Sequence, residues 1–282
     1  MYRYIACAFV LVFLAAFSAC AQQQYDDERL FQTEPTEYGT VRITGYTGPG
    51  GTVRIPARIQ GMTVTEIGAG AFTEWDSFYR GKGVTSVVIP VGIIEIGPWS
   101  FAGNQLTSVT IPRTVIYIHG EAFEDNQLTT VAIPRGVIII GDSAFRNNQL
   151  TSVTIPDTVT DIGQFAFANN QLASVAIPNS MILIRDSVFE GNQLTSVTIP
   201  DTVTVIGSNA FANNRLTSIT FPDSVKTIRG WSFGSNQITT ITIGSNVAIT
   251  HNAFDTSFNF FYVDNRRRAG TYTYNDYQWT YR

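Results

Sequence analysis

The sequence predicts a mostly β solenoid of stacked 22-residue coils, and three observations support this prediction. The triplet Asn-Gln-Leu, or a close variant, recurs every 22 residues from Asn104 to Asn236. Each unit carries the apolar spacing of residues 106–112 (LTSVTIP), and a phenylalanine repeats with the same period. A fixed period of 20–29 residues with this spacing is typical of a leucine-rich repeat, in which a coil buries its apolar face only against its neighbours.

Each coil is expected to contain two short strands and a single helical turn. Residues 106–112 predict a strand with three inward apolar side chains, and Pro112 ends it because proline has no N–H for a ladder. The spacing of Val115 and Ile118 predicts a second short strand, and the apolar pair that ends at Phe123 predicts the helical turn. The first strands of successive coils would form a concave parallel sheet.

Two rows of side chains are expected to run through the interior. Stacked coils align the phenylalanines in an aromatic column, in which each buried ring contributes roughly 1.5–3 kcal/mol. The column comprises Phe101, Phe123, Phe145, Phe167, Phe189, Phe211 and Phe233. An asparagine amide has two donors and an acceptor, so it can bond to turn backbone in its own coil and a neighbouring one. We therefore assign a structural ladder to Asn104, Asn126, Asn148, Asn170, Asn192, Asn214 and Asn236.

The N-terminal segment predicts export. Arg3 precedes an apolar stretch, residues 5–17, that is too short to span a bilayer. Residues 17–20 look like a bacterial lipobox, which makes residues 1–20 a lipoprotein signal and Cys20 the lipid attachment site. Ordinary cleavage after Ala21 is the alternative. A polar tether, residues 21–37, would then follow, and the lipid would be the only contact with a membrane, at the outer membrane or cell surface. Without lipidation the protein would be periplasmic or secreted.

Caps are expected at both ends, because the terminal coils of a solenoid expose apolar edges. Residues 38–83 predict an N-terminal cap and a first irregular coil with an insertion. In this cap, the alternating segments on either side of the Gly/Pro-rich loop 45–51 would pair as a hairpin. Residues 84–257 form the repeat solenoid. Residues 258–282 predict an aromatic hairpin around Asn275-Asp276 that covers the last coil.

Composition and motifs argue against nucleic-acid binding and catalysis. The net charge is −4 and only 14% of the residues are charged, so no basic footprint exists. His119 and His251 lie six coils apart, roughly 29 Å at about 4.8 Å per strand, and cannot share a metal or a proton. No common catalytic motif occurs. We expect the protein to have no catalytic activity, no cofactor and no metal site. A hydrolase is the distant alternative.

The first candidate partner surface is the outward side of the predicted concave sheet, where small hydroxyl side chains repeat. From its rows we select Ser108, Thr110, Ser152, Thr154, Ser196 and Thr198. A protein partner is expected, and a regular hydroxyl row could also match a glycan. The alternative is a soluble face without a ligand, because hydroxyl side chains also suit strands.

Two other candidate partner surfaces depart from the repeat pattern. The insertion at residues 73–83 contains Trp75, Phe78 and Tyr79, which either anchor a partner or cover the first coils. The residue after each proline changes from Arg113 and Arg135 to aspartate in later coils. This polarised edge either orients a charged partner or forms salt bridges between adjacent coils, worth under about 1 kcal/mol each.

The residues also support a resemblance. The unit LTSVTIPxxVxxIGxxAF, the opening GTVRITGYTGPGGTVRIP and the ending AGTYTY resemble the bacterial surface leucine-rich repeat proteins of the BspA-like family, over about residues 38–282. The resemblance implies an exported, adhesin-like protein that binds host extracellular proteins, such as fibronectin and fibrinogen, or neighbouring bacteria. The alternative is an envelope or periplasmic scaffold with no host ligand. Thr114 stands where the standard leucine-rich repeat has Asn or Cys, which weakens only the analogy to eukaryotic receptors.

Overall fold

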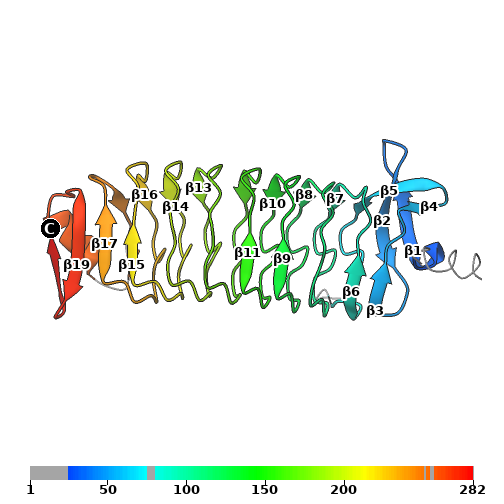
Figure 1. Ribbon diagram of the computed structural model, residues 1–282, viewed down its shortest axis with the longest axis horizontal. Helices are drawn as coiled ribbons and strands as arrows, with labels where there is room; N and C mark the ends of the chain where they lie inside the picture. The colour runs from blue at the N-terminus through cyan, green and yellow to red at the C-terminus, as the bar shows by residue number, and fades with distance from the viewer. Residues whose placement is uncertain (1–24, 75–79, 251, 255–256, 282) are drawn as a thin grey trace, which may run out of the picture.

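The computed structural model describes residues 25–74, 80–250, 252–254 and 257–281, and these residues form a rod of stacked coils (Figure 1). In the view of Figure 1 the coils follow one another along a nearly straight axis, with the N-terminal cap at one end and the C-terminal cap at the other. The strands of the coils lie in two rows along the rod, each divided into shorter and mostly parallel sheets, and we call these rows the first and the second sheet. The predicted solenoid is therefore confirmed.

The first sheet is built from the segments equivalent to 106–112. Its strands are β3 (Gly51–Arg54), β6 (Val84–Val88), β9 (Thr130–Ala132), β11 (Ser152–Thr154), β15 (Ser218–Thr220) and β17 (Thr240–Ile243). Parallel pairing joins β3 to β6, β9 to β11 and β15 to β17, and single bridges connect intervening coils. Equivalent positions lie opposite one another, as Val131 and Val153 do, so each outward row stays in line.

The second sheet follows the first around the proline corner. Its parallel strands are β2 (Val41–Tyr46), β5 (Met62–Ile67), β7 (Glu95–Ile96), β8 (Tyr117–Ile118), β10 (Ile139–Ile140) and β12 (Asp161–Ile162), then β13 (Leu183–Ile184), β14 (Val205–Ile206), β16 (Thr227–Ile228) and β18 (Ala248–Ile249). The short β4 (Arg58–Ile59) pairs with β5. Strand pairing is interrupted between β12 and β13. There, Arg185 donates two hydrogen bonds, of 2.8 and 2.9 Å, to the carboxylate of Asp161.

The predicted phenylalanine column is confirmed. From Phe101 to Phe233 every ring is buried, and neighbouring rings stack with centroids 5.4–5.9 Å apart. Phe72 extends the column at one end and Phe254 at the other. Buried valine, isoleucine and leucine side chains from both sheets complete a core that continues from coil to coil.

The third side of each coil consists of tight turns, so the predicted single turn of helix at this place is wrong. In one coil the N–H of Ser100 donates to the carbonyl of Gly97, and the N–H of Ala102 donates to that of Trp99. Trp99 adopts a left-handed conformation with φ 54°. The same conformation recurs at Glu121, Ser143, Phe165, Ser187, Asn209 and Trp231. Residues of such different kinds share one strained backbone state, so stacking imposes the turn rather than local preference.

The N-terminal cap differs from the prediction in two ways. β2 and β3 do not pair as a hairpin, because they are consecutive sides of the first coil and pair with β5 and β6 of the next one. The antiparallel hairpin instead joins β2 to β1 (Phe31–Pro35), which follows the 3₁₀-helix η1 (Glu28–Leu30). Residues 28–35, expected within the polar tether, are therefore part of the cap, and Phe31 packs against Phe72 at the end of the column.

The C-terminal cap contains the predicted hairpin and a helix that was not predicted. β19 (Gly270–Asn275) and β20 (Gln278–Tyr281) pair antiparallel, and β19 extends the first sheet by pairing with β17. The helix α2 (Phe258–Asp264) places Phe258 and Tyr262 against buried Tyr272. Together these rings close the end of the core. Among the described residues, no helix combines the length and the apolar character needed to cross a bilayer.

Candidate functional site

The repeated asparagines lie inside the turns and bond to backbone on both sides. Asn148 is buried, and its Oδ1 accepts a hydrogen bond of 3.0 Å from the N–H of Leu128 in the preceding coil. Its Nδ2 lies 2.8 Å from the carbonyl oxygen of Phe123 and 3.2 Å from those of Phe145 and Arg146. The other members of the row repeat these contacts. The row therefore satisfies polar groups of adjacent coils and presents little surface to a ligand.

The outward side of the first sheet carries two rows of small side chains, all of them serine or threonine except two alanines, and we call this surface the hydroxyl face. It comprises Ser108, Thr110, Thr130, Ala132, Ser152, Thr154, Ser174, Ala176, Ser196, Thr198, Ser218, Thr220, Thr240 and Thr242. Each of these is exposed except Thr240 and Thr242, which are half-buried beneath the C-terminal cap. The six selected positions thus share one accessible surface. They lack charge and aromatic rings, so this surface favours a long contact over a deep pocket.

One shallow depression interrupts the hydroxyl face. It has a volume of about 400 Å³ and is lined by Ser196, Val197, Thr198, Ser218 and Thr220, among others. β15 pairs with β17 on one side, but no strand pairing connects it to the coil of Thr198 among the described residues. Val197 is correspondingly half-exposed, whereas the equivalent Val175 is buried. The depression combines apolar and hydroxyl groups with the carboxylate of Asp201 at the proline corner, as a peptide or sugar site does.

The other predicted contact residues are divided between the proline corner and the insertion. Arg113 and Arg135 are exposed at the corner, and neither forms an ion pair within the described part of the chain. The alternative of salt bridges between adjacent coils is therefore wrong for these two. Trp75, Phe78 and Tyr79 lie outside the described residues, as does Cys20. The base of their insertion is an antiparallel bridge between Thr73 and Gly81.

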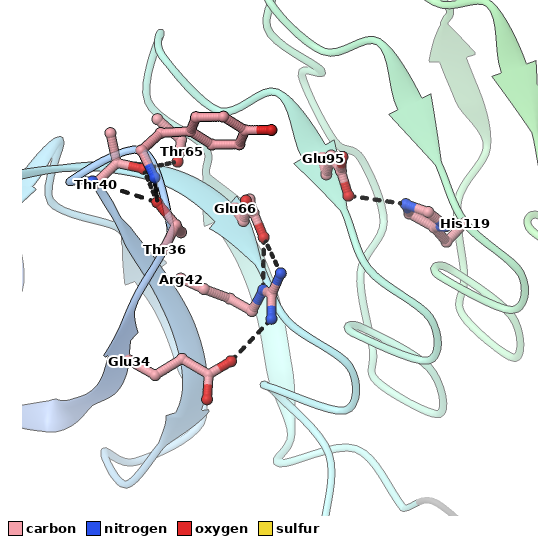
Figure 2. Close-up of polar contacts among 9 residues, drawn as sticks. Glu34, Thr36, Thr40, Arg42, Thr65, Glu66, Glu95 and His119 are labelled. Atoms are coloured by element: carbon pink, nitrogen blue, oxygen red, sulfur yellow. Dashed lines mark hydrogen bonds and ion pairs between the residues drawn. The ribbon is translucent and has the colours of Figure 1, made fainter.

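The N-terminal end of the second sheet is polar (Figure 2). Arg42 lies between two carboxylates, 2.9 Å from Glu34 and 2.5 Å from Glu66. Glu95 of β7 lies 3.2 Å from the ring nitrogen Nε2 of His119, which belongs to the following coil. These ion pairs are partly exposed and contribute little to stability. The described residues contain no cluster of three or more side chains able to hold a metal ion.

Beyond this polar end, the outward side of the second sheet is unexpectedly apolar. We call it the isoleucine face. It comprises the row Ile94, Ile116, Ile138, Thr160, Ile182, Thr204, Lys226 and Ala248, and the adjoining row Glu95, Tyr117, Ile139, Asp161, Leu183, Val205, Thr227 and Ile249. Ile138 is 41% exposed and Ile182 is 65% exposed. Sequence reasoning missed this surface, although the signal was present in the isoleucine that follows the buried apolar residue (Ile93, Val115, Val137 or Met181) in four coils.

A buried carboxyl lies on the turn side of the rod. Burial, with the nearby carboxylates of Asp125 and Glu121, raises the pKa of Glu124 to about 7. Its Oε1 lies 3.3 Å from Nη1 of Arg146, whose guanidinium stacks over the ring of Phe165 at 5.4 Å. Trp99 donates a hydrogen bond to Glu121. No nucleophile accompanies these groups, so the cluster affects stability rather than suggesting a reaction.

We predict that Glu124→Gln stabilises the protein at alkaline pH. Because the folded-state pKa of Glu124 exceeds its ordinary value of 4.5, its stabilising effect is complete below pH 4.5 and lost as pH rises through about 7. The variant should exceed the wild type by about 2 kcal/mol at pH 8 and match it near pH 4 in urea unfolding. Glu190→Gln is the control, because Ser187 stands there in place of Glu121. Equal pH profiles for all three proteins would contradict the prediction.

Comparison with known proteins identifies the repeat. The family model described as "BspA type Leucine rich repeat region (6 copies)" matches residues 65–195 and 183–269. The chain belongs to this BspA-type family. No curated protein matches the sequence. Repeat proteins of this kind typically mediate protein–protein interaction and typically are not enzymes.

Solved structures of bacterial proteins share the fold of this BspA-type chain. The T. pallidum leucine-rich repeat protein is 27% identical, with a TM-score of 0.59, over 67% of this chain and 89% of that one. A leucine-rich repeat protein from Bacteroides ovatus is 24% identical, with a TM-score of 0.63, over 80% of this chain and 67% of that one. One from Eubacterium ventriosum is 21% identical, with a TM-score of 0.51.

Proposed function

We propose that this BspA-type protein is exported, held at the bacterial surface by a lipid on Cys20, and binds other proteins non-covalently through its hydroxyl face. The observation that carries the proposal is the hydroxyl face itself, which stays accessible and in register from Ser108 to Thr220. A folded partner or an extended segment could contact many coils at once. The family's usual role in protein interaction and the export signal predicted from residues 1–20 support the same conclusion.

A binding partner would use the hydroxyl face by summing many small contacts. Its side chains offer donors and acceptors but no aromatic anchor, so each coil adds little affinity. The depression at Ser196–Thr220 is the best-defined point of attachment, because half-exposed Val197 can be covered there by an apolar group. Extracellular host proteins and the surface proteins of neighbouring cells are the partner classes we propose.

We predict that charged side chains on the hydroxyl face abolish capture by immobilised extracellular proteins or cells. A variant with Ser152→Lys, Thr154→Lys, Ser196→Lys and Thr198→Lys should lose at least about tenfold in affinity, because unpaired charges would be desolvated in the contact. Gln149→Lys with Gln171→Lys, at exposed positions outside both the hydroxyl face and the isoleucine face, is the control, and circular dichroism should show both variants folded. If the hydroxyl variant binds normally, the hydroxyl face is not the site.

The proposed location is tested separately. Protease added to intact cells should remove a surface protein and leave a periplasmic scaffold intact. Cys20→Ala should release the protein from the membrane fraction. Protection from protease in intact cells would favour the alternative of an envelope scaffold without an external ligand.

A further inference from the structure

The proposed function leaves the isoleucine face unused. Its apolar side chains lie in the three consecutive coils of Ile94, Ile116 and Ile138 and, after a coil with Thr160 and Asp161, in the coil of Ile182. Ile94, Ile138 and Ile182 are solvent-exposed to 38–65%. Exposed apolar side chains that gather on one face of a soluble protein commonly mark an interaction surface. Polar contacts border it at the N-terminal end, where Glu95 pairs with His119.

The charges beside this face indicate what covers it. The residue after each proline lies on the corner that borders the isoleucine face, and Ser245, after Gly244, holds the equivalent place in the last coil. In chain order this row reads Val91, Arg113, Arg135, Asp157, Asn179, Asp201, Asp223 and Ser245. The basic members lie towards one end and the acidic members towards the other, and all five charged side chains are exposed. When two copies of this row lie side by side in opposite directions, the basic side chains of one therefore face acidic side chains of the other.

We propose that the isoleucine face binds a second copy of this chain, with the two rods antiparallel. The two-fold axis of this dimer lies in the plane of the contact, at right angles to both rods, and passes between the coils of Asp157 and Asn179. Rotation about it places each row of one copy along the same row of the other copy, in the opposite direction. Arg113 then faces Asp223 of the second copy, and Arg135 faces Asp201. By symmetry each pair forms twice, as in any isologous contact.

The same axis places side chains of the two isoleucine faces opposite one another. Ile139 lies opposite Val205 of the second copy, and Ile138 lies opposite Thr204, which presents a methyl group beside its hydroxyl. Near the axis, the Asp161–Arg185 pair of one copy meets that of the other, so each carboxylate has a guanidinium on both sides. Lys226 falls opposite Ile116 at the end of the contact, where its stem can pack while its ammonium reaches water.

The size of the face predicts a weak, reversible dimer. Eight coils at about 4.8 Å make a contact about 38 Å long, and four residues of strand and corner make it about 13 Å wide. The two copies together would bury about 1,000 Å², near the lower limit for a specific interface. Dissociation constants in the micromolar range are expected for such areas. Because the corner row is shared, the two hydroxyl faces would lie on the same side of the dimer, doubling the width of the proposed binding surface.

The experiment is sedimentation equilibrium of the protein in a Cys20→Ala background, which removes any acyl chain as a source of association. The parent should show a concentration-dependent dimer. Arg135→Asp alone and Asp201→Arg alone should each weaken dimerisation at least about tenfold, because each places like charges opposite each other twice. The double variant Arg135→Asp with Asp201→Arg should restore it to within about threefold.

A second variant tests the apolar part of the contact. Ile138→Thr introduces the residue that Thr160 and Thr204 already supply at equivalent positions, so the fold should tolerate it, and dimerisation should weaken about tenfold. A protein that stays monomeric at every concentration would overturn the proposal. So would a dimer that ignores all these substitutions, or a double charge variant that fails to recover. Capture through the hydroxyl face by a monomeric protein would retain the proposed function while ending this inference.

Discussion

Replacing Asn148 by alanine is expected to destabilise the protein by about 2–4 kcal/mol. The substitution leaves the buried N–H of Leu128 without its partner, which costs about 1–3 kcal/mol. It also removes one of the two amide donors to the carbonyl of Phe123, which keeps only its hydrogen bond from Asn126, and this loss costs about 1 kcal/mol. Because the side chain joins two coils, the loss affects both. Urea unfolding followed by circular dichroism should show a lower midpoint, and hydrogen exchange should be fastest at these two coils.

The adjacent residue supplies the control. Asn147 has the same side chain but lies towards the outer surface, with φ 55°. It donates a solvent-exposed hydrogen bond of 2.8 Å to Asp125 and accepts one of 2.9 Å from Asn169. Glycine already occupies the equivalent position at Gly103 and Gly191, so Asn147→Gly should change stability by less than about 0.5 kcal/mol. Equal losses for the two variants would show that the interior ladder has no special energetic role.

Truncating a ring in the middle of the aromatic column should have a comparable effect. Phe167 is fully buried between Phe145 and Phe189, with ring centroids 5.5 and 5.9 Å away. Phe167→Ala should cost about 3–5 kcal/mol, since the cavity cannot collapse between stacked coils. In a quasi-one-dimensional protein this defect weakens the coupling between the two halves of the rod. A broadened or two-step urea transition is therefore expected.

Phe165 is the matched control for this ring, two residues earlier. It is half-buried with φ 58°, and its main partner is the guanidinium of Arg146. Phe165→Asn removes that contact but relieves the left-handed strain, as Asn209 does at the equivalent position. The net change should be under about 1 kcal/mol. If Phe165→Asn proved as damaging as Phe167→Ala, the column would not be the main source of stability.

The sequence predicts those parts of this fold that repeat. The inward positions of Leu106, Val109 and Ile111 follow from the apolar pattern, and all three are buried. The asparagine and phenylalanine rows could be predicted because every coil must pair the same turn backbone groups and bury the same part of its core. The hydroxyl face could be predicted because its residues alternate with the buried ones.

Features that occur once were harder to predict. β1 pairs with β2 across a short turn, but residues 31–35 carry too little apolar alternation to predict a strand. α2 starts after Ser257, but that serine makes no side-chain cap hydrogen bond, and a helix of seven residues is too short to show a clear apolar period. The left-handed turns at Trp99 and Glu121 contradict local preference and exist because the neighbouring coils impose them. The isoleucine face escaped notice because one strand of two residues is too short to show alternation.

Strands in both sheets lie across the rod, so the hydrogen bonds between coils run along its length. A pulling force on the two chain ends would load these bonds one coil at a time, by unzipping rather than by shear. The two cysteines of the chain, Cys7 and Cys20, both lie near the N-terminus, so no disulfide can hold the coils together. Each coil that detaches would release 22 residues, about 75 Å of extended chain, in place of about 4.8 Å of rod. The molecule is therefore suited to yield in equal steps under tension and to dissipate mechanical work while its remaining coils stay intact.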